Sequence, residues 1–274
     1  MTDDPNPDTV YQRAKKKIAE ARQDLVSAHQ DLSALRGQIR HARSRGRVHQ
    51  EVWNCERALG LRDSYFSQSG QDAFLEERIF RGKRDGTFFE IGGYDGVTGS
   101  NCLFFEMQRG WSGVVVEPSP QYHAACTAAR RVPVLQLAIG GQTGKAEFLD
   151  VREGLRQMGG LVRSYDPGTR AQVEADPRHI GEVIQVDVVT LAELLDKHNL
   201  RSIDYLSLDV EGAEMEILSD FPFANYRIDA LTVENRLDSE ELPELLSANG
   251  FHRIEAVGVD DIYVSDPVLE RLRD

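Results

Sequence analysis

The apolar residues of the chain follow two different periods, and the change falls near residue 62. Between residues 9 and 62 they recur about every 3.5 residues, the period of a helix that packs along a seam. Beyond residue 63, short apolar runs alternate with stretches of helical periodicity, which is the pattern of strands joined by helices. We therefore predict a helical, coiled-coil-like segment at 9–62 and a main domain at 63–274. The prolines and aspartates of residues 1–8 favour a disordered tail.

The helical segment carries a heptad repeat in two registers. The first register is Tyr11, Ile18, Leu25, Leu32 and Ile39, and the second is Ala14, Ala21, Ala28, Leu35 and Ala42. Such a seam associates helices, so residues 11–42 predict a homo-oligomer. The alternative is a helix folded back on its own domain. Gly46 is expected to end or kink the helix, because glycine costs about 1 kcal/mol in a helix interior.

The main domain contains nine predicted strands. They are 87–93, 111–118, 133–140, 144–150, 182–189, 203–210, 228–235, 251–257 and 260–266. Helical patterns separate most of them, which predicts a Rossmann-like α/β fold with a parallel sheet and helices on both faces. The last two strands follow each other directly and predict a C-terminal antiparallel hairpin. Residues 153–181 are rich in glycine and break the alternation, so we expect an insertion that acts as a lid or binding loop.

Charge is distributed unevenly along the chain. The net charge is −13, but residues 1–62 carry +4 and the remainder −17. An acidic main domain argues against nucleic-acid binding, which depends on phosphate contacts. The basic residues cluster near the end of the helical segment, where they form a solvated face or dock an anionic partner or the acidic domain itself. This cluster is Arg36, Arg40, Arg43, Arg45 and Arg47.

Hydropathy and cysteine content suggest the compartment. No run approaches the roughly 18 apolar residues of a membrane span. The first ten residues, MTDDPNPDTV, are acidic and lack the apolar core of a secretory signal. The three cysteines are not spaced as metal ligands, and their odd number favours reduced thiols. We expect a cytoplasmic protein without a membrane span.

The first predicted strand runs into FFEIGGYDGVTGSN, residues 88–101. The glycines allow a ligand to approach the backbone closely. A dinucleotide fingerprint would read GxGxxG, but Tyr94 occupies the place of its second glycine. Glu90 and Asp95 would repel a diphosphate and would suit S-adenosylmethionine, which is cationic and has no phosphate. The alternative is a tight turn in which these acids serve only as caps.

Four further strand ends carry candidate chemistry. Glu117 ends the second strand, where a carboxylate can accept ribose hydroxyls. Ala138 and Ile139 are small enough near the third strand end to admit an adenine ring. The strands 203–210 and 228–235 end at adjacent tips with Asp209, Glu234 and Asn235. These three side chains could hold Mg²⁺, and the alternative for Asp209 is a helix cap.

Five segments occur in the order typical of one family. They are SQSGQD (67–72), FFEIGGYDGVTGSN, GWSGVVVEPSP (110–120), LAIGGQTGKAEF (137–148) and IDYLSLDVEGAEMEIL (203–218). In these segments the chain resembles FkbM-type methyltransferases over residues 65–264. The resemblance implies the class I methyltransferase sheet, S-adenosylmethionine as cofactor, and hydroxyls of sugars, polyketides or glycans as acceptors. The chain departs from the family at Tyr94, because the turn reads GGYDG where GANDG is common.

The resemblance also implies roles for individual residues. Gln68 and Gln71 would lie near the cofactor unless they only start a helix, and Asp209 and Glu211 would flank the transferred methyl group. Together with the turn and strand ends, the predicted cofactor-binding set is Gln68, Gln71, Glu90, Gly92, Gly93, Tyr94, Asp95, Asn101, Glu117, Pro118, Ala138, Ile139, Asp209 and Glu211.

These observations predict an S-adenosylmethionine-dependent methyltransferase that acts on a hydroxyl of a sugar, glycan or natural product. An alcohol must lose its proton to a base or to a metal-assisted step. The candidate catalytic residues are Asp209, Glu234 and His179 of the insertion. Three alternatives stay open: a non-catalytic scaffold that assembles partners, an NAD-dependent oxidoreductase, and an N-terminal helix that anchors the protein to a membrane or glycan surface.

Overall fold

The computed structural model describes residues 7–236 and 238–273, so most of the predicted tail lies outside the described residues. Its main sheet has the strand order β10-β11-β9-β8-β1-β2-β3. The strands are β1 (Thr87–Ile91), β2 (Ser112–Val116), β3 (Val134–Leu135), β8 (Ser202–Leu208), β9 (Arg227–Glu234), β10 (Phe251–Val257) and β11 (Asp260–Ser265). The first five of these run parallel, while β11 and β10 pair antiparallel at one edge. The predicted parallel sheet and C-terminal hairpin are confirmed.

The strand order reverses between β1 and β8. From β1 the chain continues to β2 and β3 on one side, and β8 later returns to pair with the free side of β1. In open parallel sheets a ligand crevice forms at the carboxyl ends of the strands where such a reversal occurs. This topology places the candidate site at the ends of β1 and β8.

Helices cover both faces of the main sheet, as predicted. Successive residues of a strand point to opposite faces, so Phe88 and Phe89 belong to two separate cores. The core containing Phe89 is closed by α7 (Leu191–Lys197), α8 (Glu214–Ser219) and α9 (Glu241–Ala248). The core containing Phe88 is closed by the π-helix η1 (Leu75–Phe80), which follows α3 (Gln71–Phe74), and by α4 (Leu103–Arg109), α5 (Pro120–Ala129) and α10 (Asp266–Arg273).

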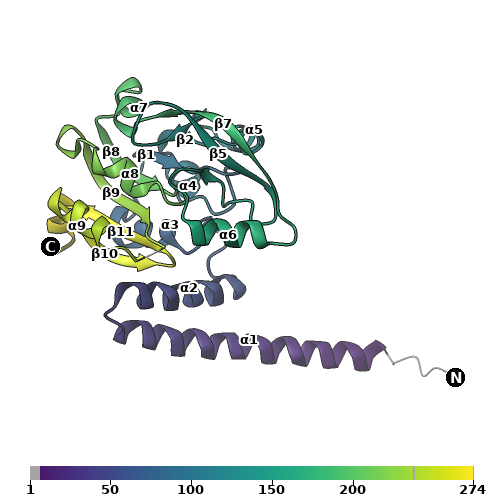
Figure 1. Cartoon of the computed structure of the whole chain (residues 1–274). Helices are drawn as coiled ribbons and strands as arrows, with labels where there is room; N and C mark the ends of the chain where they lie inside the picture. The colour runs from purple at the N-terminus through teal and green to yellow at the C-terminus, as the bar shows by residue number, and fades with distance from the viewer. Residues whose placement is uncertain (1–6, 237, 274) are drawn as a thin grey trace.

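The predicted third strand, residues 133–140, divides between two sheets. Its first half is β3, which pairs with β2, but Ala138–Ile139 forms β4 of a second sheet. The Leu137 N–H donates to the Leu135 carbonyl at 3.2 Å, which turns the chain between them. The second sheet has the order β4-β7-β5-β6 and lies beside the main sheet (Figure 1).

The predicted insertion is an ordered part of this second sheet. The long strands β5 (Gly144–Glu153) and β7 (Ile180–Val189) form an antiparallel ribbon. Between them the chain forms the short strand β6 (Gly160–Leu161) and the helix α6 (Pro167–Ala175). Residues 153–181 therefore pack on the body of the protein through both elements.

The N-terminal segment is a helical hairpin, α1 (Pro7–Gln38) followed by α2 (Ala42–Ala58). The helix break lies at residues 39–41, so the prediction of a break at Gly46 was wrong. Gly46 is buried within α2, where a Cβ would lie 2.6 Å from the Gly258 carbonyl oxygen. The glycine is required by this close approach between α2 and the β10–β11 turn, which outweighs its cost in a helix.

Three arginines of the basic cluster dock α2 and the end of α1 on their own domain. Arg36 and Arg45 both contact Glu255 of β10, at 2.9 and 2.8 Å. Arg43 is buried and donates to the carbonyl oxygens of Gly258 and Asn235. Of the alternatives left open by the sequence, the structure shows docking on the acidic domain.

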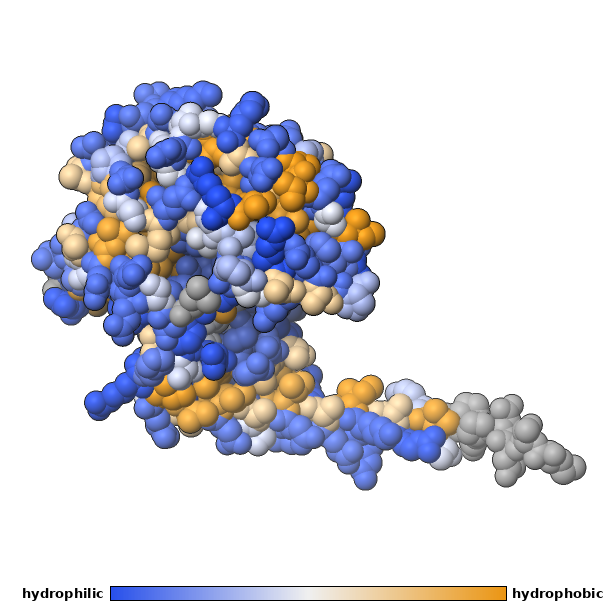
Figure 2. Space-filling view, viewed as in Figure 1, coloured by the Kyte–Doolittle hydropathy of each residue, from blue (hydrophilic) through white to orange (hydrophobic). Residues whose placement is uncertain are grey.

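The other end of α1 extends past the body of the protein (Figure 1). Its apolar residues are exposed there, with Tyr11 at 61% and Ile18 at 70% accessibility. Figure 2 shows apolar side chains in a row along α1. No described helix has the length and apolar character to cross a bilayer.

Candidate active site

A cavity of about 860 Å³ opens at the carboxyl ends of β1, β2, β8 and β9. Its volume lies in the range typical of small-molecule and cofactor sites. Thirteen of the predicted site residues line it: Gln68, Gln71, Gly92, Gly93, Tyr94, Asn101, Glu117, Pro118, Ala138, Ile139, Asp209, Glu211 and Glu234. The other four, Glu90, Asp95, His179 and Asn235, are not among the described residues that line it.

The glycine turn after β1 forms one wall. Gly92 has φ +94°, and a Cβ there would collide with the Asp209 carbonyl of the adjacent strand end. The turn continues to Tyr94, whose ring lies 4.5 Å from that of Tyr122, measured between centroids. The paired rings line the cavity together. The residue at which the chain departs from the pattern of the family it resembles therefore borders the cavity.

Glu90 and Asp95 do not line the cavity, and both already have partners within the protein. The Glu90 carboxylate pairs with buried Arg130 at 2.6 Å and accepts the Asn101 backbone N–H at 2.9 Å. Asp95 caps the turn locally and accepts the Thr98 backbone N–H at 2.7 Å. The structure therefore favours the capping alternative for both acids. Because neither carboxylate lines the cavity, the positions of Glu90 and Asp95 do not support a selection of a phosphate-free cofactor by their charge.

The carboxyl group of Glu117 lines the cavity at the end of β2. One of its oxygens accepts the Tyr94 backbone N–H at 2.7 Å, and the other accepts that of Ser119 at 2.8 Å. Each oxygen keeps a further lone pair for a ligand hydroxyl. Burial raises the pKa of Glu117 to about 8 against the effect of the two amides, and the charge of Asp150 adds to the rise. The carboxyl is thus fixed in orientation, while its charged form is poorly solvated.

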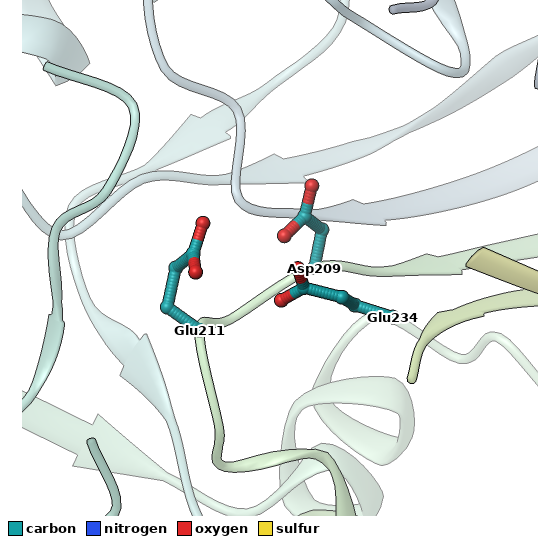
Figure 3. A group of neighbouring side chains, drawn as sticks. All are labelled: Asp209, Glu211 and Glu234. Carbon is teal, nitrogen blue, oxygen red and sulfur yellow. The ribbon is translucent and has the colours of Figure 1, made fainter. Parts of the chain in front are cut away.

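Three carboxyl groups meet at the ends of β8 and β9. One oxygen each from Asp209, Glu211 and Glu234 lies within 4.8 Å of the others (Figure 3). Desolvation inside the cavity raises the pKa of all three, although the Asp209 side chain is exposed to the cavity, and the charge of Asp209 adds most to the rise in Glu211 and Glu234. Arg236 partly compensates the cluster through contacts with Glu211 at 3.3 Å and with Glu234.

The cluster could hold a hard cation with two of the three ligands that the sequence suggested, Asp209 and Glu234, but not with Asn235. Asn235 donates to Asp261 at 2.9 Å and to the Ser239 carbonyl, so its amide is used outside the cavity. Glu211 takes its place as the third oxygen donor. Three carboxylates fit Mg²⁺ chemically, although Arg236 already supplies positive charge to two of them.

Several groups at the cavity were missed by the sequence reasoning. Asp260, at the start of β11, lies opposite Glu234 and accepts a hydrogen bond from Gln71 at 2.7 Å. Burial and the charge of Asp209 raise its pKa to about 7. Pairing the predicted strand 260–266 with the predicted strand 228–235 would have placed Asp260 opposite Glu234. Arg236, Tyr122 and residues of α2 also line the cavity, and no local pattern indicated them.

His179 lies in the loop between α6 and β7. Its backbone N–H donates to the Asp176 carbonyl at 2.8 Å, and its ring packs against Gly181. The residue is half-buried, and it does not border the cavity. Nothing in its surroundings places it near a reacting group.

The fold and the cavity define a doubly wound α/β protein with a ligand site at its topological switch point. The family model described as the methyltransferase FkbM domain matches residues 90–253. The chain therefore belongs to the FkbM methyltransferase family, and the family expected from its motifs is confirmed.

Other comparisons are more distant. No curated protein matches the sequence. Among solved structures, the precorrin-6Y C5,15-methyltransferase of Geobacter metallireducens GS-15 is similar at 13% identity and a TM-score of 0.39. The similarity covers 73% of this chain and 89% of that one. It is too weak to support any assignment of residues.

Proposed function

We propose that this protein transfers the methyl group of S-adenosylmethionine to a hydroxyl of a small-molecule or glycan acceptor. The charge of the cavity is the observation that carries the proposal. Seven carboxyl groups and three guanidinium groups line it: Glu51, Glu117, Asp150, Asp209, Glu211, Glu234 and Asp260 against Arg47, Arg156 and Arg236. Such a lining favours a sulfonium and an amino group, because their positive charge stabilises carboxylates whose pKa values are raised without a ligand, and it disfavours a diphosphate.

The walls offer a place for each part of the cofactor. Gly92 and Gly93 give close backbone approach, and the Glu117 carboxyl faces the ribose hydroxyls. Ala138 and Ile139, now in β4, border the space for the adenine ring. The methionine end would then lie toward Gln68 and Gln71, on the side of the acidic cluster.

The reaction is an in-line displacement. The acceptor oxygen forms the new bond to the methyl carbon, the carbon–sulfur bond breaks, and its electron pair stays on the sulfur of S-adenosylhomocysteine. The hydroxyl proton passes to a carboxylate, for which Asp209 and Glu234 are the candidates. The raised pKa of both carboxyls makes them stronger bases than ordinary acids. His179 does not line the cavity and takes no part in the proposal.

Calorimetry with S-adenosylhomocysteine tests the cofactor assignment. Glu117→Ala should weaken binding about tenfold or more, because it removes hydrogen bonds to a carboxylate. Asp209→Ala should bind the cofactor product within about threefold of wild type but lose most methyl transfer from labelled S-adenosylmethionine. A wild-type protein that binds neither S-adenosylmethionine nor its product would refute the enzyme and leave the non-catalytic scaffold.

We extend the proposal to a divalent cation such as Mg²⁺ at Asp209, Glu211 and Glu234. The ion would lower the pKa of a bound hydroxyl and fix its orientation. Titration of Mg²⁺ into metal-free protein should show binding, and Arg236→Ala should tighten it by removing the competing guanidinium. Unchanged activity after thorough chelation would remove the metal from the mechanism.

We also propose that α1 self-associates through its projecting end. Val10, Tyr11 and Ile18 are exposed there and lie next to the small alanines of the heptad. Ile18→Glu should shift the sedimentation coefficient to that of a monomer, while Lys16→Glu on the same helix should not. A wild-type monomer at high concentration would rule out this association.

A further inference from the structure

The N-terminal hairpin forms one side of the cavity. Leu32 of α1 and the residues Arg47, Val48, Gln50 and Glu51 of α2 all line it. They lie outside residues 90–253, which carry the family domain. In Figure 1 α2 lies between α1 and the body, next to the end of the sheet formed by β10 and β11. The segment predicted for oligomerisation therefore also borders the reaction space.

Hydrogen bonds and packing hold α2 against residues 67–71. The His49 ring bonds to the Ser69 carbonyl at 3.1 Å, and burial, followed by the charge of Arg36, lowers its pKa to about 4, so it stays neutral. Gln50 accepts the Ser69 hydroxyl and donates to the Gln68 carbonyl at 3.3 Å. The Trp53 ring packs on Gly70, where a Cβ would come within 2.7 Å of it.

The same contacts fix α2 relative to the proposed cofactor site. Residues 67–71 contain Gln68 and Gln71, and Gln71 bonds to Asp260 of the acidic wall. On the other side, Gly46 and buried Arg43 hold the β10–β11 turn that precedes Asp260. A ligand in the cavity would thus meet α2 as a rigid surface, which is what a specificity wall requires.

Two side chains of α2 are available for such a ligand. The side chain of Arg47 is exposed and forms neither a hydrogen bond nor an ion pair with any described residue. Glu51 follows one helical turn later and is also exposed, with only a 3.3 Å bond from Asn54. No ion pair joins Arg47 to Glu51 in the described chain. A guanidinium only donates hydrogen bonds and a carboxylate only accepts them, so together they match neighbouring hydroxyl groups, which do both.

We propose that α2 is the acceptor-binding wall of the cavity, with Arg47 and Glu51 as the specificity-determining groups that bind a polyhydroxylated acceptor. The inference rests on the proposed methyl transfer. It assigns to the N-terminal hairpin a role in the site itself, in addition to any role in self-association. The cofactor end of the cavity is formed by other elements, so the two ends can be tested separately.

The first experiment uses methyl α-D-glucopyranoside as the probe and the complex with S-adenosylhomocysteine. Saturation-transfer NMR should detect the saccharide on the wild-type complex. The double variant Arg47→Ala/Glu51→Ala should weaken it about tenfold, because charged hydrogen bonds to the ligand are lost. Its affinity for S-adenosylhomocysteine should stay within about twofold of wild type, since neither residue is assigned to the cofactor.

The matched control is Arg57→Ala, which removes an exposed arginine of the same helix that does not line the cavity. It should leave saccharide binding unchanged. Equal binding by wild type and the double variant, or no saccharide binding by a wild-type complex that does hold S-adenosylhomocysteine, overturns the inference. A wild-type protein that fails to bind S-adenosylhomocysteine refutes the proposed function instead.

A second measurement keeps both binding groups in place. All three native cysteines are buried, so Val48→Cys introduces a single accessible thiol on the cavity wall. Bound saccharide should slow its alkylation by iodoacetamide several-fold and should leave the alkylation of Arg57→Cys unchanged. Equal alkylation rates of Val48→Cys with and without saccharide would place the saccharide away from α2 and contradict the proposal.

Discussion

Two groups of acids lie at neighbouring strand ends, and they differ in how their charge is compensated. Near the end of β1, Glu90 is enclosed and pairs with Arg130, which also contacts Glu106 at 2.6 Å. After β8, the carboxyl groups of Asp209 and Glu211 meet Glu234, and among the described residues Arg236 is the one cation that pairs with them. The first group is satisfied inside the protein, whereas the second faces the cavity with an excess of negative charge.

The difference separates structural acids from candidate functional ones. Burying charges that are paired and hydrogen-bonded holds the glycine turn in place. Crowding three carboxyls around one guanidinium costs stability and raises pKa values, and such perturbation is concentrated at functional sites. An acid at a strand end is therefore informative only when its partners are known.

Arg130→Met should produce the largest effect. It leaves Glu90 and Glu106 buried without their shared cation, and loss of one partner of a buried pair costs about 3–5 kcal/mol. Urea denaturation followed by circular dichroism measures the free energy of unfolding. Arg131→Ala removes the exposed neighbouring arginine and should change it by less than about 0.5 kcal/mol. If Arg130→Met lowered the free energy of unfolding by less than about 0.5 kcal/mol, the buried ion pairs of Arg130 with Glu90 and Glu106 would not be needed for stability.

The pH dependence of stability should come next in size. The pKa of Glu117 is raised to about 8 in the folded protein, so between its usual pKa and pH 8 the folded state keeps a proton that the unfolded state has lost. The free energy of unfolding should therefore fall as pH rises from 5 to 8. Glu117→Gln removes this proton difference and should make the slope shallower by up to about 1.4 kcal/mol per pH unit.

Denaturation curves of wild type and Glu117→Gln at several pH values between 5 and 8 measure this slope. Parallel slopes for the two proteins would mean that Glu117 is charged throughout this range in the folded state. In that case the cavity would accept the charge of Glu117 without an energetic penalty, and the acids of the cavity would resemble the compensated Glu90 group more closely.

Glu211→Gln should have the smallest effect and the opposite sign. The amide keeps the size of the side chain, removes one of three crowded charges, and leaves Arg236 to pair with Glu234. We expect about 1 kcal/mol of added stability at pH 8, with reduced methyl transfer. Asp220→Asn alters an exposed acid at the C-terminal end of α8 that does not line the cavity, and it should leave stability unchanged at the same pH. A loss of stability in Glu211→Gln would show that the cluster is as well compensated as the Glu90 group.

Much of the fold could be predicted because strands and helices follow local periodicity. The parallel strands β1, β2, β8 and β9 were predicted from apolar runs of the right length, and the final hairpin from two runs joined by a short turn. The third strand was predicted only in part, because its division between two sheets depends on pairing with β7, about fifty residues later. The helix break was misplaced for a similar reason, since the fit of Gly46 against Gly258 is a contact between distant parts of the chain.

The sequence by itself determined the strand ends that carry the site, because side chains that follow parallel strands must meet at one edge of the sheet. It also determined the family, through the order of five motifs. Only the tertiary structure decided which acids face the cavity. Charge compensation depends on distant partners, since Arg130 lies 40 residues from Glu90 and Arg236 lies 25 residues from Glu211. The tertiary structure likewise brought α2 to the cavity, because docking of a helix depends on surfaces that form only after the domain has folded.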